Sequence, residues 1–196
     1  MQLLEIVYKS IAFFSVLSFS ITPAFGDIKC NIVNLSNPNI VSCSQISFER
    51  IDKILNEQYK ALSADIDSSL KPNLLATQRA WIKLKEEYCV GDDYSGLEGP
   101  IERLSCMKQF TSFRLNELVY LRTGVINDGF YKAVSIVNER ITAMNYIKAF
   151  EYVSGEVSFG HLWSDYAEKN CAMTLILYGE ATDKCMARMK FQMPIH

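Results

Sequence analysis

Apolar side chains recur at helical spacing in the first half of the chain. Between residues 48 and 70 they stand three, four or seven positions apart, at Phe48, Ile51, Leu55, Leu62, Ile66 and Leu70. This spacing predicts one amphipathic helix, because it places the apolar groups on a single helical face. Proline does not fit a helix interior, so we expect this helix to close before Pro72.

Two further helices are expected in the same half. In residues 74–89 the apolar side chains fall in series seven apart, Leu74, Trp81, Tyr88 and Leu75, Ile82, Cys89, and Gly91 then ends the helix. Proline suits a first helical turn, so the next helix starts near Pro100 and runs to Gly124. Its apolar side carries Ile101, Leu104, Thr111, Leu115 and Leu118.

The second half repeats this order more loosely. An apolar stripe at Phe130, Val134, Val137, Ile141 and Met144 precedes a break at Ser154-Gly155. We expect a helix through Trp163 and Cys171, and a short last helix with Cys185 and Met189. No clean apolar and polar alternation lies between hairpin turns, so the chain is predicted to be all-α.

The two tryptophans indicate an internal duplication. Trp81 and Trp163 each stand eight residues before a cysteine, an offset of 82 that also aligns Asn56-Glu57 with Asn138-Glu139. We therefore predict two small, disulfide-stabilised three-helix units in tandem, over residues 27–123 and 124–196, the second a degenerate copy.

The first 26 residues resemble a secretory signal peptide. Lys9 precedes an apolar run from Ile11 to Ile21, and Ala24-Phe25-Gly26 supplies the small residues that are typical of a signal-peptide cleavage site. An uncleaved anchor helix is the alternative, but eleven residues rise only about 16 Å against a hydrocarbon core of about 30 Å. We expect a periplasmic or secreted protein without a membrane span after cleavage.

All six cysteines follow this segment, and an even number in a secreted chain favours disulfides. Cys89 ends one predicted helix and Cys106 lies in the next, so a disulfide between them would fix the antiparallel turn that joins these two helices. Cys171 and Cys185 are equivalent in the second half, which leaves Cys30 to pair with Cys43 and close a loop. Zinc-type cysteine spacing is missing, so metal ligation is the weaker alternative.

Composition and charge argue against several classes of function. Hydrophobic residues make up 49% of the chain, which excludes a disordered polypeptide. Twenty Lys and Arg against 22 Asp and Glu give a net charge of −2, so no global basic field predicts nucleic-acid binding. With two histidines and no nucleophile elbow, phosphate loop or zinc motif, we expect no enzyme, no cofactor and no metal. Lys184, Arg188 and Lys190 are interpreted as a basic helix end.

An ordered series of motifs runs through residues 55–118: Leu55-Asn56-x-x-Tyr59-x-x-Leu62, Gln78-Arg79-Ala80-Trp81, Lys85-Glu86-x-x-Cys89, Cys106 and Thr111-x-x-Arg114-x-x-x-Leu118. The series resembles the LprI-like lysozyme-inhibitor family over about residues 30 to 122. The family usually has Arg-Asp where this chain has Lys85-Glu86, and Gly160-His161-Leu162 replaces Gln-Arg-Ala in the second half. The resemblance implies a non-enzymatic secreted or periplasmic protein whose activity belongs to the first half.

The motif residues have two interpretations. The favoured one is structural: Trp81 fills the core, while Arg79, Glu86 and Arg114 pair across neighbouring helices. The structural set is Tyr59, Gln78, Arg79, Trp81, Glu86, Thr111, Arg114 and Trp163. The alternative is that part of this set forms a recognition surface.

The stretch from Glu86 to Glu102 is the candidate binding element. It holds six acidic residues and no Lys or Arg. An acidic, disulfide-clamped loop can enter a cationic cleft, with apolar groups supplying burial. The predicted contact residues are Asp92, Asp93, Tyr94, Leu97 and Glu98. A merely solvated acidic surface is the alternative.

These observations predict a protein that binds and blocks a basic cell-wall hydrolase such as lysozyme. The competing hypothesis is an envelope structural or adaptor module that binds another envelope protein.

Overall fold

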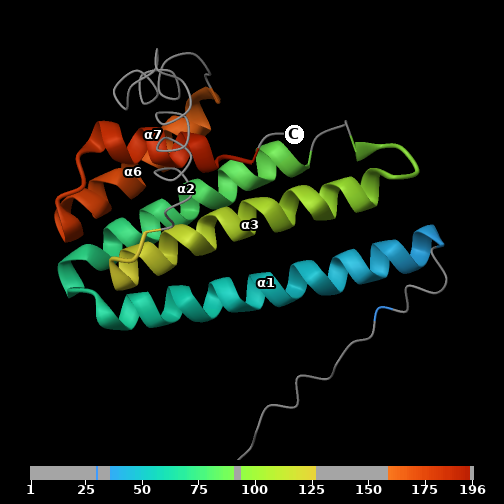
Figure 1. The fold of residues 1–196 in the computed structure, drawn as a ribbon, viewed down its shortest axis with the longest axis horizontal. Helices are drawn as coiled ribbons and strands as arrows, with labels where there is room; N and C mark the ends of the chain where they lie inside the picture. The colour runs from blue at the N-terminus through green and yellow to red at the C-terminus, as the bar shows by residue number, and fades with distance from the viewer. Residues whose placement is uncertain (1–29, 31–35, 91–93, 127–158, 195–196) are drawn as a thin grey trace, which may run out of the picture. The chain divides into compact units, whose positions relative to one another are not determined.

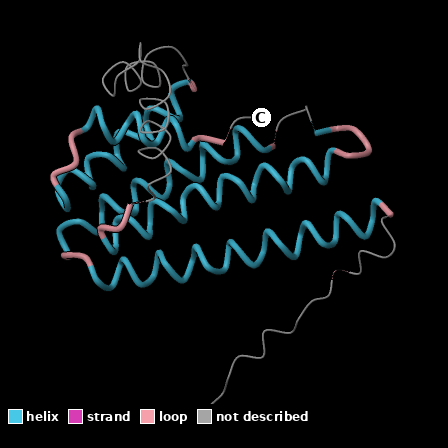
Figure 2. The backbone as a smooth tube through the Cα atoms, viewed as in Figure 1, coloured by secondary structure: helices cyan, strands magenta, loops and turns pink. Residues whose placement is uncertain are grey.

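The computed structural model of this chain describes residues 30, 36–90, 94–126 and 159–194. They form five α-helices and one 3-10 helix: α1 (Asn37–Asp65), η1 (Ser68–Leu70), α2 (Lys71–Cys89), α3 (Gly99–Thr123), α6 (Gly160–Tyr178) and α7 (Thr182–Gln192). Figure 2 shows only helices and loops in this part of the chain. The predicted all-α class is confirmed.

The first predicted helix has different ends. α1 begins at Asn37, so Cys43 lies inside this helix and not in a loop. It stops at Asp65, and Pro72 stands in the first turn of α2. α1 thus closes before Pro72, as predicted, but it stops short of Leu70, which lies in η1. Pro72 belongs to α2, and its missing amide proton costs nothing in a first turn, where that group lacks a helical partner.

The third predicted helix is confirmed at both ends. Pro100 lies in the first turn of α3, and Gly124 caps its last turn. Gly124 adopts a left-handed backbone with φ of 69° and donates its amide hydrogen bond to the Tyr120 carbonyl over 2.9 Å. A left-handed cap strongly favours glycine, since other side chains are strained there.

The helices pack in a fixed order of neighbours. α1 lies along α3, α2 contacts both α3 and α6, and α6 forms a hairpin with α7. Figure 1 shows α1 and α3 running in the same direction, with α2 antiparallel to them. α3 also contacts α6, so it has three neighbours, and its buried side chains face them.

The buried side chains of all five helices form one apolar cluster. It joins Leu62 of α1, Leu84 of α2 and Leu118 of α3 to Tyr166 of α6 and Met189 of α7. The predicted arrangement as two tandem units is not confirmed, because the described parts of the two halves share this core. The predicted stripe at Phe130 to Met144, the break at Ser154-Gly155 and the signal segment lie outside the described residues.

The cysteine predictions agree with the structure. Cys89 is bonded to Cys106 and Cys171 to Cys185, each pair with Cα atoms 5.6 Å apart. Cys30 and Cys43 are disulfide-bonded as well. Three disulfides suit an oxidising compartment. Of the helices within the described ranges, none is both long and apolar enough to cross a membrane.

Candidate partner-binding corner

The corner between α2 and α3 is fixed by a disulfide. Cys89 is the last residue of α2 and Cys106 lies in the second turn of α3, and both side chains are fully buried. The bond closes the loop that contains the described segment 94–98, which we call the corner turn. A closed loop has fewer conformations to lose when it binds a partner.

Two tyrosines brace the corner turn from inside. The Tyr94 hydroxyl donates to the Tyr88 carbonyl over 3.2 Å, and the Tyr88 hydroxyl donates to the Phe159 carbonyl over 3.0 Å. The Tyr88 ring packs against Phe110 with centroids 5.3 Å apart. Burial raises the pKa of Tyr88. Tyr94 therefore positions the turn, and its hydroxyl is engaged within the protein.

The turn also depends on Gly99. A Cβ atom at this position would stand 1.8 Å from the Tyr94 carbonyl oxygen, so no larger residue fits without movement of the backbone. The Gly99 amide donates to the Gly96 carbonyl over 3.0 Å. Close backbone approach at Gly99 thus sets the shape of the corner turn.

Leu97 lies at the tip of this braced turn with 90% of its surface exposed. Glu98 beside it is exposed and begins α3, its carbonyl accepting from the Ile101 and Glu102 amides over 2.8 and 3.1 Å. A carboxylate at a helix N-terminus is favoured by the helix dipole. Of the five predicted contact residues, Leu97 and Glu98 are presented to solvent, whereas Asp92 and Asp93 lie outside the described residues.

Basic side chains border the acidic stretch in space. Lys83, Lys85 and Arg103 line the same surface hollow as Glu86 and Glu87. The sequence from 86 to 102 contains no base, but the fold brings these three to its edge. The hollow therefore presents side chains of both charge signs beside the acidic stretch.

Trp81 occupies the core, as predicted, and Trp163 lies in the same core. Trp81 is 2% exposed and its Nε1 donates to the Phe110 carbonyl over 3.1 Å. The Lys85 ammonium lies 4.6 Å from the Trp81 ring centroid, and burial lowers the pKa of Lys85. Trp163 stacks on Phe113 with centroids 6.0 Å apart.

Two other motif residues also face inward. Thr111 is buried, and its hydroxyl donates to the Met107 carbonyl of its own helix over 2.7 Å. Tyr59 is partly buried against the core cluster. Neither side chain is therefore positioned to make the main contact with a partner protein.

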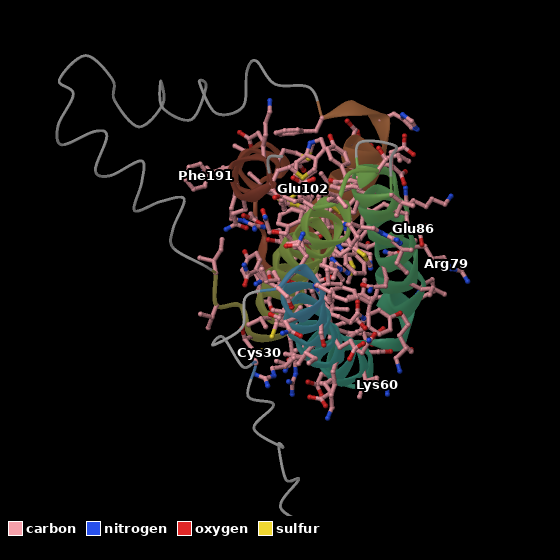
Figure 3. The ribbon with its side chains drawn as sticks, turned by 90° about the vertical axis from the view of Figure 1, so that its right-hand side faces the viewer. Cys30, Lys60, Arg79, Glu86, Glu102 and Phe191 are labelled. Carbon is pink, nitrogen blue, oxygen red and sulfur yellow. A yellow bond between two sulfur atoms is a disulfide. The ribbon has the colours of Figure 1, made fainter. Side chains whose placement is uncertain are left out.

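The charged motif residues separate into two groups. Arg114 is fully buried and donates to Gln78 over 2.9 Å and to Asn170 over 2.8 Å. Arg79 and Glu86 instead are exposed on α2 and point outward in Figure 3. No ion pair within the described ranges includes either of them, so their predicted pairing across helices is wrong. They lie on the side of α2 opposite the core.

A buried polar network links α3 to α6 and α7, and sequence reasoning missed it. Arg188 forms ion pairs with Glu117 and Glu180, and Asn170 donates to Glu117 over 2.7 Å. Burial lowers the pKa of Arg188, but the two carboxylates outweigh it and hold this pKa above its ordinary value. The interpretation of Arg188 as part of a basic helix end is thus wrong.

One signal could have pointed to this network. Glu117 stands three residues after the motif residue Arg114, on the same side of α3, and both charges would need partners when buried. Among the described residues, no cluster of His, Cys, Asp or Glu could hold a metal ion.

Comparison with known proteins identifies the first part of the chain. Residues 30–118 match the family model described as lysozyme inhibitor LprI, which confirms the resemblance inferred from the motifs. The matched region runs from Cys30 through α1 and α2 into the last turns of α3. No curated protein and no solved structure matches this chain.

Proposed function

We propose that this protein binds a lysozyme-type cell-wall hydrolase outside the cytoplasm and inhibits it without performing chemistry itself. The observation that carries the proposal is the match of residues 30–118 to the lysozyme inhibitor LprI family. The three disulfides support an oxidising compartment, where such hydrolases act.

The corner turn is the element that we propose enters the cleft of the hydrolase. Leu97 is 90% exposed on a turn that Gly99 and a disulfide hold in place. An exposed apolar side chain on a preorganised loop can gain burial at low entropic cost. Glu98 and the neighbouring Asp92 and Asp93 would supply negative charge toward a basic partner.

An inhibition assay tests this function. The oxidised, purified secreted chain is added to a panel of basic lysozymes, and the lysis rate of a bacterial cell-wall suspension is followed. We expect lysis by at least one of these hydrolases to fall in proportion to the inhibitor, toward zero near one equivalent. Undiminished lysis at micromolar excess throughout the panel contradicts the proposal. The same titration with a reduced, alkylated chain is the control for the folded corner.

A further inference from the structure

The outer face of α2 carries a regular stripe of exposed side chains. We define this face by Leu75, Arg79, Ile82, Glu86 and Val90, which follow one another at three or four residues and so lie along one line of the helix. The three apolar members are 42%, 37% and 55% exposed in chain order. Figure 3 shows Arg79 and Glu86 pointing away from the bundle.

None of the described core residues of α2 belongs to this stripe. The core-facing residues of α2, among them Leu74, Trp81 and Leu84, lie on the opposite side of the helix. Within the part of the chain that the structure describes, the hydrogen bonds and ion pairs leave Arg79 and Glu86 uninvolved. Exposed apolar side chains beside an exposed arginine and an exposed glutamate are available to a partner.

The stripe is complementary to itself. Its residues are symmetric about a point midway between Ile82 and Lys83, since Arg79 and Glu86 stand equally far from that point, as do Leu75 and Val90. When two such helices lie antiparallel across a two-fold axis, Arg79 faces Glu86 of the partner subunit and Glu86 faces the partner's Arg79. Leu75 then faces Val90 of the partner subunit, and Ile82 faces Lys83 of the partner subunit, so the two Ile82 side chains flank the axis.

We propose that the outer face of α2 binds a second copy of this chain as an antiparallel, two-fold symmetric helix pair. Both charge contacts and all the apolar contacts are satisfied at once, which an unrelated flat surface would not provide. A net charge of −2 on each chain gives little repulsion. α2 is about 28 Å long at 1.5 Å per residue, so this pair buries less than a standard interface, and the dimer is weak.

Charge reversal tests the dimer by sedimentation equilibrium of the oxidised full chain. Arg79→Glu places like charges opposite each other twice, as does Glu86→Arg, so each variant alone should raise the dissociation constant roughly tenfold. An equimolar mixture of the two variants restores both attractions, and so does the double variant R79E/E86R. Both should regain the association of the wild type.

Lys60→Glu is the matched control, because this exposed residue of α1 undergoes the same change of net charge as Arg79→Glu. It should leave the dissociation constant unchanged. Circular dichroism of each variant verifies that the fold persists. A wild-type chain that stays monomeric at several hundred micromolar overturns the proposal. A mixture that associates no better than its two components overturns it as well.

Discussion

Glu117 of α3 and Arg188 of α7 form an ion pair in which both side chains are 1% exposed. The pair joins a residue inside the LprI-type region to one 70 positions beyond its end at residue 118, and Arg188 forms a second ion pair with Glu180. Buried charges are tolerated when they are paired, and removal of one partner leaves the other uncompensated. The hairpin of α6 and α7 is thus electrostatically tied to α3.

Replacing Arg188 with methionine should destabilise the protein strongly. The substitution leaves the Glu117 carboxylate buried without its guanidinium, which costs about 3–5 kcal/mol in comparable pairs. Urea unfolding of oxidised protein measures the change in free energy. The control is Lys169→Met, which breaks an exposed pair with Asp165 and should cost less than about 1 kcal/mol. Equal losses in both variants would contradict the role given to the buried pair.

A fragment that ends at residue 126 should fail to fold cooperatively. It contains the whole region matched to LprI, but it lacks Asn170, which accepts a hydrogen bond from Arg114, and Arg188, which forms the ion pair with Glu117. It also exposes core side chains that α6 covers. Thermal unfolding monitored by circular dichroism measures whether the fragment unfolds cooperatively. The dispersion of its amide proton NMR signals shows whether it has a fixed tertiary structure. A sharp transition and dispersed amide signals would show instead that the hairpin is dispensable.

Stability should fall with pH above 10 because of Tyr166. Burial raises the pKa of Tyr166 to about 12, against an ordinary value of 10 in the unfolded chain. Since the folded pKa is the higher one, this contribution is complete below pH 10 and is lost as the pH rises toward 12. This difference in pKa between the folded and the unfolded chain corresponds to about 3 kcal/mol in the free energy of unfolding once it is fully lost.

Tyr166→Phe removes this ionisation. The difference in unfolding free energy between wild type and variant should therefore shift against the wild type by about 2 kcal/mol from pH 10 to pH 12, because the loss is not complete until the pH exceeds the folded pKa. Urea titrations at each pH measure it. Parallel curves for the two proteins across this range would rule out the assigned cause.

Local signals predicted several elements correctly because their causes are local. Pro100 and Gly124 mark the ends of α3 through backbone geometry that needs no tertiary information. The pairing of Cys89 with Cys106 followed from their places in consecutive helices. Pro72 marked a helix boundary correctly but not the last residue of α1, because a proline is compatible both with the region after a helix and with the first turn of the next one.

Features that depend on which helices are neighbours in the fold could not be predicted from the sequence. Arg79 and Arg114 both belong to the motif series, yet one is exposed and the other is fully buried. Helical periodicity gives relative directions around one helix, not the identity of its neighbours. The contact between Glu117 and Arg188 spans 71 positions, beyond the reach of any local pattern.

The corner turn should respond to single substitutions when inhibition is measured. Leu97→Ala removes the exposed apolar group, and we expect about tenfold weaker inhibition of the target hydrolase. Glu98→Lys should weaken inhibition and make it less sensitive to salt, because a screened attraction is lost. Leu175→Ala on α6 and Glu57→Lys on α1 are matched exposed controls and should leave inhibition unchanged.

Hydrogen exchange on the oxidised chain, with and without saturating lysozyme, tests the placement of the hydrolase most directly. Amides of the corner turn and the first turn of α3 are predicted to exchange more slowly in the complex, while the middle of α1 keeps the rate of the free protein. Protection confined to α1 or α7, with an unchanged corner turn, would contradict the account.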